Sequence, residues 1–176
     1  MMKCRYILFF LFLLLFVTTN SYAQHNPQAS SIVRVSLVKG IQVNQISGNL
    51  DFGEIIQPTT QTTIRKSPDN GVVFLLNSHL NKNVSVQYSS STLSNSGWVN
   101  GYGGSTASLT FNPEVVHTGS NSVFQNPIEI ISGNSYTPPT SAGIASMNIW
   151  VGGSIEIIPN QPQGDYSGTF TITLTY

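Results

Sequence analysis

The sequence predicts an all-β protein, an antiparallel β-sandwich, and three observations lead to this prediction. Apolar and polar residues alternate with a period of two in several segments, as they do in strands that bury one face. Turn-forming residues separate these segments about every ten positions, a spacing typical of sandwiches and barrels. Helix signals are missing, because no stretch combines a sustained 3.6-residue apolar period with a capping residue at its start.

The first residues have the three parts of a secretory signal peptide. Lys3 and Arg5 supply positive charge, residues 7–17 are uninterrupted apolar residues, and Ser21 and Ala23 are the small residues that a signal peptidase reads. The apolar run is too short for a spanning helix, which needs about 20 such residues. We therefore expect cleavage after Ala23, export, and a mature chain of residues 24–176 that forms a single β-sandwich domain without a membrane span.

The composition of the mature chain excludes disulfides and argues against partners that need a basic surface. Cys4 is the only cysteine and precedes the expected cleavage point, so the mature domain has no disulfide. Removal of Lys3 and Arg5 leaves 7 − 2 = 5 basic residues against 7 acidic ones, a net charge of 5 − 7 = −2. Such a chain offers no basic patch to nucleic acid or to anionic lipid.

The first predicted strand region carries its apolar residues at odd positions only. Val33, Val35 and Leu37 form its first part, and Ile41 and Val43 continue it. The Lys39-Gly40 pair interrupts the alternation and predicts a hinge or a bulge.

The middle of the chain predicts further short strands, separated by turns and two long loops. Asn70-Gly71 is suited to the positive backbone angles of a tight turn. Residues 89–106 are rich in serine, glycine and asparagine and predict a long loop, and residues 132–143 predict a second one. The expected strands cover residues 50–55, 62–66, 72–76, 84–88, 107–111, 114–117 and 127–131.

The last part of the chain shows the clearest strand pattern. Residues 145–151 and 154–158 flank Gly152-Gly153 and predict a tight hairpin. A final strand is predicted over residues 166–176, with threonines at alternate positions on its polar face. Its opposite face carries Tyr166, Phe170, Ile172, Leu174 and Tyr176.

The residues of known reaction chemistries are scattered, so we expect a protein that is not an enzyme and holds no cofactor or metal. His25, His79 and His117 are isolated, without a second ligand type at metal-like spacing. No nucleophile elbow, phosphate-binding glycine loop or zinc-protease motif occurs. Asp51 and Glu54 flank Phe52 and are interpreted as a solvated strand edge.

Three aromatic residues lie in the predicted loops and are candidates for ligand binding. Trp98 and Tyr102 fall in the first long loop, and Tyr136 falls in the second. Aromatic rings on loops can stack on sugars or fill a partner's pocket. The competing interpretation is that these rings cover the ends of the sandwich.

Three sequence blocks resemble an uncharacterised family of secreted bacterial domains. Residues 50–55 (LDFGEI) are similar to a segment near the start of that family, and residues 151–155 (VGGSI) are similar to an internal block. Residues 163–176 (QGDYSGTFTITLTY) are similar to its closing strand. The blocks occur in the same order and span nearly the whole mature chain.

A weaker resemblance extends to spore-coat-U-type proteins and to subunits of chaperone–usher pili. Pilus subunits carry a glycine twelve residues before an aromatic residue near their end, and Gly164 and Tyr176 have this separation. Here the aromatic residue is the last one rather than the penultimate one, and the disulfide common among pilins is missing. The resemblance implies an immunoglobulin-like, pilin-like sandwich that lacks one strand.

The same resemblance implies a function and partners. A periplasmic chaperone would first supply the missing strand, and another copy or a related subunit would later replace it by β-augmentation. The implied location is the periplasm, the cell surface or the medium of a Gram-negative bacterium. Residues implied in strand exchange are Val33, Val35, Leu37, Gly164, Tyr166, Phe170, Ile172, Leu174 and Tyr176.

Two questions stay open at this stage. Residues 24–31 are polar and poorly suited to act as a donor strand, whereas Val33, Val35 and Leu37 could form one, with Lys39-Gly40 as its hinge. The same run could instead be the start of one long first strand that bends between the sheets. The alternative function is a self-contained secreted module that binds a glycan or a protein through its loop aromatics.

Overall fold

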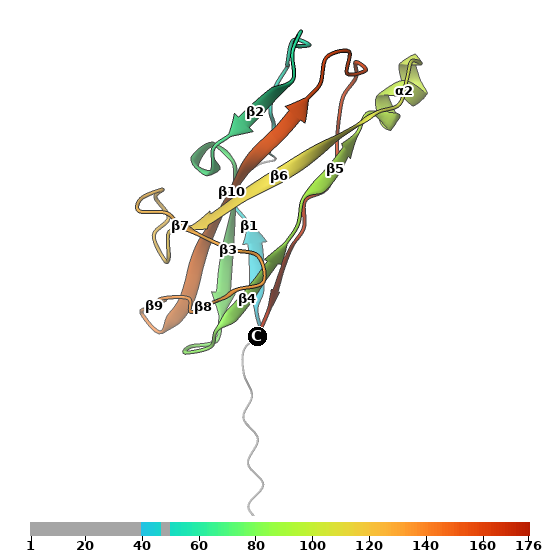
Figure 1. Cartoon of the computed structure of the whole chain (residues 1–176). Helices are drawn as coiled ribbons and strands as arrows, with labels where there is room; N and C mark the ends of the chain where they lie inside the picture. The colour runs from blue at the N-terminus through green and yellow to red at the C-terminus, as the bar shows by residue number, and fades with distance from the viewer. Residues whose placement is uncertain (1–39, 47–49) are drawn as a thin grey trace, which may run out of the picture. The chain divides into compact units, whose positions relative to one another are not determined.

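Two antiparallel β-sheets make up the fold, which confirms the predicted all-β sandwich (Figure 1). The computed structural model describes residues 40–46 and 50–176, which all belong to one unit spanning residues 37–176. The predicted signal peptide and the run Val33, Val35 and Leu37 lie outside the described residues.

Within the described residues, the larger sheet has eight strands and the smaller sheet has three. The larger sheet contains β1 (Gln42–Gln45), β2 (Thr62–Lys66), β3 (Val72–Ser78), β5 (Ser91–Ser94), β6 (Ser108–His117), β7 (Ile128–Glu129), β9 (Thr140–Ser141) and β10 (Ile144–Ile157). The smaller sheet contains β4 (Val84–Tyr88), β8 (Ser135–Tyr136) and β11 (Ile172–Thr175). Two short helices complete the described part, the 3₁₀-helix η1 (Pro68–Asn70) and α2 (Ser96–Tyr102).

The order of the strands determines which edges of the sandwich are closed. The larger sheet runs β1-β3-β10-β6-β5, and the smaller one runs β11-β4-β8. The chain passes directly from β4 in one sheet to β5 in the other, and residues 128–136 cross back from β6 to β4. Both crossings lie on the β5–β6 side of the sandwich, so β1 and β11 are left at the opposite side.

The predicted hairpin at Gly152-Gly153 is wrong, because β10 is one continuous strand of 14 residues. Its first half pairs with β3 and its second half with β2, while residues 67–71 bulge out between these two strands. Glycine is required where the bulge meets β10. A Cβ on Gly152 would lie 2.4 Å from the Lys66 carbonyl oxygen, and one on Gly153, at φ +153°, would lie 2.4 Å from the Asn112 carbonyl oxygen.

Other elements differ from the predictions in extent. The predicted loop 89–106 contains β5 and α2, and residues 108–117 form one strand instead of two. Residues 50–55 form no strand. The predicted final strand is regular only over β11, although Ser167 makes an isolated bridge to Ser94 further up the chain. The strands predicted at 62–66 and 84–88 match β2 and β4.

Two apolar clusters fill the space between the sheets. The first cluster lies between β3, β10 and β6 of one sheet and β4 of the other, and it consists of Leu76, Val84, Val86, Val115, Ile130, Met147, Ile149 and Val151. The second lies toward the β2 end and consists of Leu109, Phe111, Ile155 and Ile157. Phe170 contacts both clusters and stacks edge-on against Phe111, with ring centroids 5.9 Å apart.

Candidate functional site

The first candidate site is the side of the sandwich where β1 and β11 form the outer strands. In the described part of the chain, β1 pairs only with β3, and β11 pairs only with β4. Beside β1 the larger sheet continues through β3 and β10 to β6, whereas the smaller sheet is three strands wide. The smaller sheet is therefore too narrow to cover the larger one along this side.

Apolar residues along this side are incompletely buried. Ile172 and Leu174 point from β11 toward the first apolar cluster but remain half-buried. Ile41 packs against the same cluster just before β1. The Val43 side chain, in the middle of β1, is 43% exposed. This arrangement can accept a further strand, whose main chain would pair with β11 and whose apolar side chains would complete the core.

The residues predicted for strand exchange are only partly brought together. Val33, Val35 and Leu37 lie outside the described residues. Tyr166 packs against the second cluster at the far end of the sandwich, and its hydroxyl group donates to the Pro162 carbonyl oxygen (2.5 Å).

Tyr176 and Gly164 lie at opposite ends of the final segment. The Tyr176 hydroxyl oxygen accepts a hydrogen bond from the His79 backbone N–H (2.8 Å), which ties the end of the chain to the turn after β3. Gly164, at φ +141°, begins this segment and lies against the ring of Trp98 on α2. The structure thus gives Gly164 a packing role away from the β1–β11 side.

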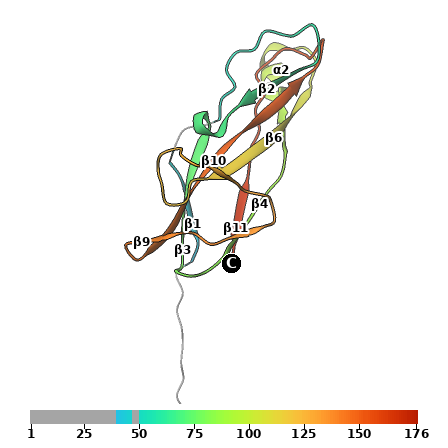
Figure 2. The same ribbon diagram turned by 60° about the vertical axis from the view of Figure 1, so that its left-hand side comes forward.

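The second candidate site is the aromatic pair on α2, at the end of the unit remote from the C-terminus (Figures 1 and 2). The Trp98 and Tyr102 rings lie 5.4 Å apart at an interplanar angle of 33°. Trp98 is half-buried, whereas Tyr102 is 79% exposed. These two predicted ligand-binding residues are thus adjacent.

Tyr136, the third predicted ligand-binding aromatic, is separate from this pair. It lies on β8, half-buried, with its ring edge-on to His117 (5.6 Å between centroids). Its hydroxyl oxygen accepts a hydrogen bond from the Ile131 backbone N–H (2.6 Å). Tyr136 therefore fixes the segment that crosses between the sheets, and its hydroxyl group is engaged within the fold.

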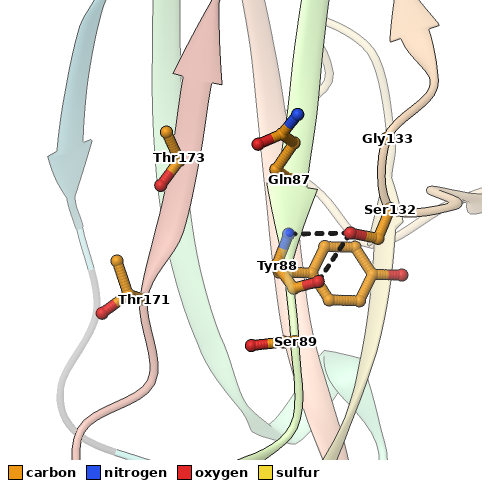
Figure 3. A pocket seen from close by; sticks show the side chains of 7 residues that line it. All are labelled: Gln87, Tyr88, Ser89, Ser132, Gly133, Thr171 and Thr173. Carbon is orange, nitrogen blue, oxygen red and sulfur yellow. Dashed lines mark hydrogen bonds between the residues drawn. The ribbon is translucent and has the colours of Figure 1, made fainter.

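A shallow hollow of about 490 Å³ lies on the outer face of the smaller sheet (Figure 3). Its floor is β4, and its walls are the final segment and the loop at Ser132, whose hydroxyl group accepts from the Tyr88 N–H (2.9 Å) and donates to the Tyr88 carbonyl oxygen (2.6 Å). The lining residues are Gln87, Tyr88, Ser89, Ser132, Gly133, Thr171 and Thr173. They are uncharged, and sequence reasoning did not identify this hollow because its walls come from three separate segments.

Neither metal-binding groups nor spanning helices occur among residues 40–46 and 50–176. No cluster of three or more histidine, cysteine or acidic side chains there could hold a metal ion. Within the same residues, no helix is long and apolar enough to cross a membrane.

These features define an antiparallel β-sandwich with one open side and an exposed aromatic pair at one end. The chain belongs to the family described as a domain of unknown function, DUF4402, whose model matches residues 41–176. No curated protein and no solved structure matches the chain.

Proposed function

We propose that this chain is a non-enzymatic, exported subunit of a bacterial surface structure that assembles by exchanging β-strands between copies. The observation that carries the proposal is the open side between β1 and β11, where Ile172 and Leu174 remain half-buried at the edge of the narrower sheet. A strand added beside β11 would widen that sheet from three to four strands and bury these two side chains.

Residues 31–38 of another copy supply a fitting donor strand. Val33, Val35 and Leu37 recur at every second position, so all three would point to the same face of an added strand. Burial of one such side chain is favourable by about 1.5–3 kcal/mol, and main-chain hydrogen bonds to β11 would add to this. The signal-peptide pattern at residues 1–23 supports export, and a periplasmic chaperone would be needed to cover the open side before assembly.

A single substitution in the donor segment tests this proposal. In the exported protein, Val35→Asp would bring a carboxylate into the apolar side and should abolish oligomers, because an unpaired buried charge is strongly unfavourable. Ser36→Asp is the matched control, since its side chain would point away from the core. Size-exclusion chromatography with light scattering measures the result.

The outcome separates three interpretations. Loss of oligomers in Val35→Asp, with oligomers retained in Ser36→Asp, supports strand exchange. If the wild-type protein is a monomer and Val35→Asp lowers its melting temperature, residues 33–37 belong to the sandwich of their own copy. A monomeric wild type whose melting temperature Val35→Asp leaves unchanged would exclude any strand role for the segment.

A second candidate function is a secreted binding module. The specific observation in its favour is the tilted ring pair of Trp98 and Tyr102, with Tyr102 largely exposed.

A further inference from the structure

The exposed ring of Tyr102 packs on one side against the ring of Trp98. Trp98 lies between the Tyr102 ring and the loop at Gly164, where a Cβ would come within 3.1 Å of the indole. Gly104, at φ +107°, also lies near this indole, which would be 3.7 Å from a Cβ built on it. One ring of the pair is therefore packed into the protein, and the other presents its outer face to solvent.

A buried asparagine holds this end of the unit together. Asn95, which is fully buried, precedes α2 and donates from Nδ2 to the carbonyl oxygens of Ser105 (3.1 Å) and Gln163 (3.2 Å). Its Oδ1 accepts from the Ala107 N–H (2.7 Å). These bonds join three chain segments around the aromatic pair, so the platform is ordered before any ligand arrives.

The surroundings of the pair are polar and almost uncharged. Residues 83–113 contain no charged side chain, and no lysine or arginine follows Lys82 anywhere in the chain. Asp165, next to Gly164, is exposed and is the ionisable residue nearest in sequence to the segments that meet at Asn95. The segments that meet here carry no lysine or arginine to pair with an anionic ligand, whereas their serine, asparagine and glutamine side chains can hydrogen-bond neutral hydroxyl groups.

From this geometry we infer that the Trp98–Tyr102 platform binds a neutral polysaccharide. The C–H face of a sugar ring would pack on the exposed face of Tyr102, and its hydroxyl groups would meet the uncharged polar side chains around it. Rigid tyrosines surrounded by serine, glycine and asparagine are a composition that recurs in adaptable binding surfaces. This site lies at the end of the unit away from Tyr176, and it does not depend on strand exchange.

Binding of the purified protein to a panel of neutral polysaccharides tests the inference. The probes are cellulose, chitin, β-1,3-glucan, mannan and galactan, with alginate and heparin as anionic comparisons. We expect binding to at least one neutral probe and none to the anionic ones. Tyr102→Ala should weaken that binding about two- to tenfold, since an aromatic contact of about 0.5–1.5 kcal/mol accounts for such a factor.

Two further variants keep this test specific. Tyr102→Phe keeps the ring and should retain binding. Val123→Ala removes another exposed apolar side chain elsewhere and should have no effect. Thermal melts of all variants show whether the fold is intact. The inference is overturned if the wild type binds no neutral probe, if it binds only the anionic ones, or if folded Tyr102→Ala binds as well as the wild type.

Discussion

Individual buried polar residues fix the loops of this sandwich in place. Asn95 joins the segment before α2 to residues 105–107 and 163, and Asn148, also buried, bonds through its backbone N–H to the Gly119 carbonyl oxygen (2.7 Å). Sequence reasoning missed both residues. Asn95 lies in a polar stretch with the signature of an exposed loop, and Asn148 lies within the predicted strand 145–151, where no local pattern marks its side chain. Their roles depend on partners that are distant in the sequence, and no local pattern encodes those partners.

His117 should make the stability of the fold depend on pH. Burial lowers the pKa of its imidazole below the usual value of 6.5, since burial disfavours the charged form. Its Nδ1 accepts a hydrogen bond from the Gly119 N–H (3.3 Å), which the neutral ring with its proton on Nε2 can do and the charged ring cannot.

The direction of this pH effect follows from linkage. The folded state binds the proton less tightly than the unfolded state. The contribution of neutral His117 to the free energy of unfolding is therefore fully present above pH 6.5. It is lost as the pH falls below 6.5, and the loss ends below the folded-state pKa. We expect a slope of at most about 1.4 kcal/mol per pH unit in urea unfolding between pH 7.5 and 5. The slope should shrink in His117→Gln, and an identical slope in that variant would contradict the assignment.

At the scale of elements, β10 organises the larger sheet. It pairs with β3 and β2 along one edge and with β6 along the other, and at Gly152 and Gly153 the neighbouring backbones leave no room for a Cβ. A Gly-Gly pair between two strand-like runs is a turn signal in the sequence alone. Gly152 instead admits the bulge at residues 67–71, and Gly153 admits the close approach of Asn112 and Phe111 on β6, which only the assembled sheet reveals.

Replacing Gly152 with alanine should therefore destabilise the fold. Its Cβ would meet the Lys66 carbonyl oxygen at 2.4 Å and the Pro68 nitrogen at 2.6 Å, both backbone atoms that cannot move without disturbing β2 and η1. We expect a loss of about 2 kcal/mol or more in the free energy of unfolding, within the range for overpacked sites. Gly101→Ala on α2 is the control, since nothing lies within 4 Å of its built Cβ, and it should be neutral or stabilising by up to about 1 kcal/mol.

Strands with strict alternation could be predicted from the sequence, whereas elements defined by their partners could not. β2 and β4 match their predicted ranges because their period-two patterns reflect one buried face. The serine-rich β5 carries no such pattern, since it is a short strand held by pairing with β6 on one side and by the Ser94–Ser167 bridge on the other. The seven-residue α2 was missed because it has neither a buried face nor a side-chain cap.

For the candidate sites, the sequence predicted which residues contribute but not how the fold arranges them in space. The apolar face of the final segment was predicted, and Tyr166, Phe170, Ile172 and Leu174 do pack against the two clusters. Trp98 and Tyr102 were singled out as loop aromatics, but their stacking and the separation of Tyr136 depend on how distant segments meet.

For the whole molecule, the central claim concerns the open side between the first and last described strands. The two crossings on the β5–β6 side close one edge of the sandwich, and the difference in width between the sheets leaves the other edge incomplete. Thr173 and Thr175 point outward from β11, next to the half-buried Ile172 and Leu174. An added strand would thus alternate in the same way, with Val33, Val35 and Leu37 inward and Arg34 and Ser36 outward.

Disulfide trapping between two copies tests this claim most directly. One exported copy carries Thr173→Cys, and a second, differently tagged copy carries Arg34→Cys or Ser36→Cys. Residues 24–176 contain no native cysteine that could compete. Neighbouring strands bring such outward positions within disulfide range. Strand exchange predicts disulfide-linked pairs of the two copies for at least one of these combinations, and none when the second copy carries the inward Val35→Cys. Cross-links found only within single copies, or none at all, would contradict it.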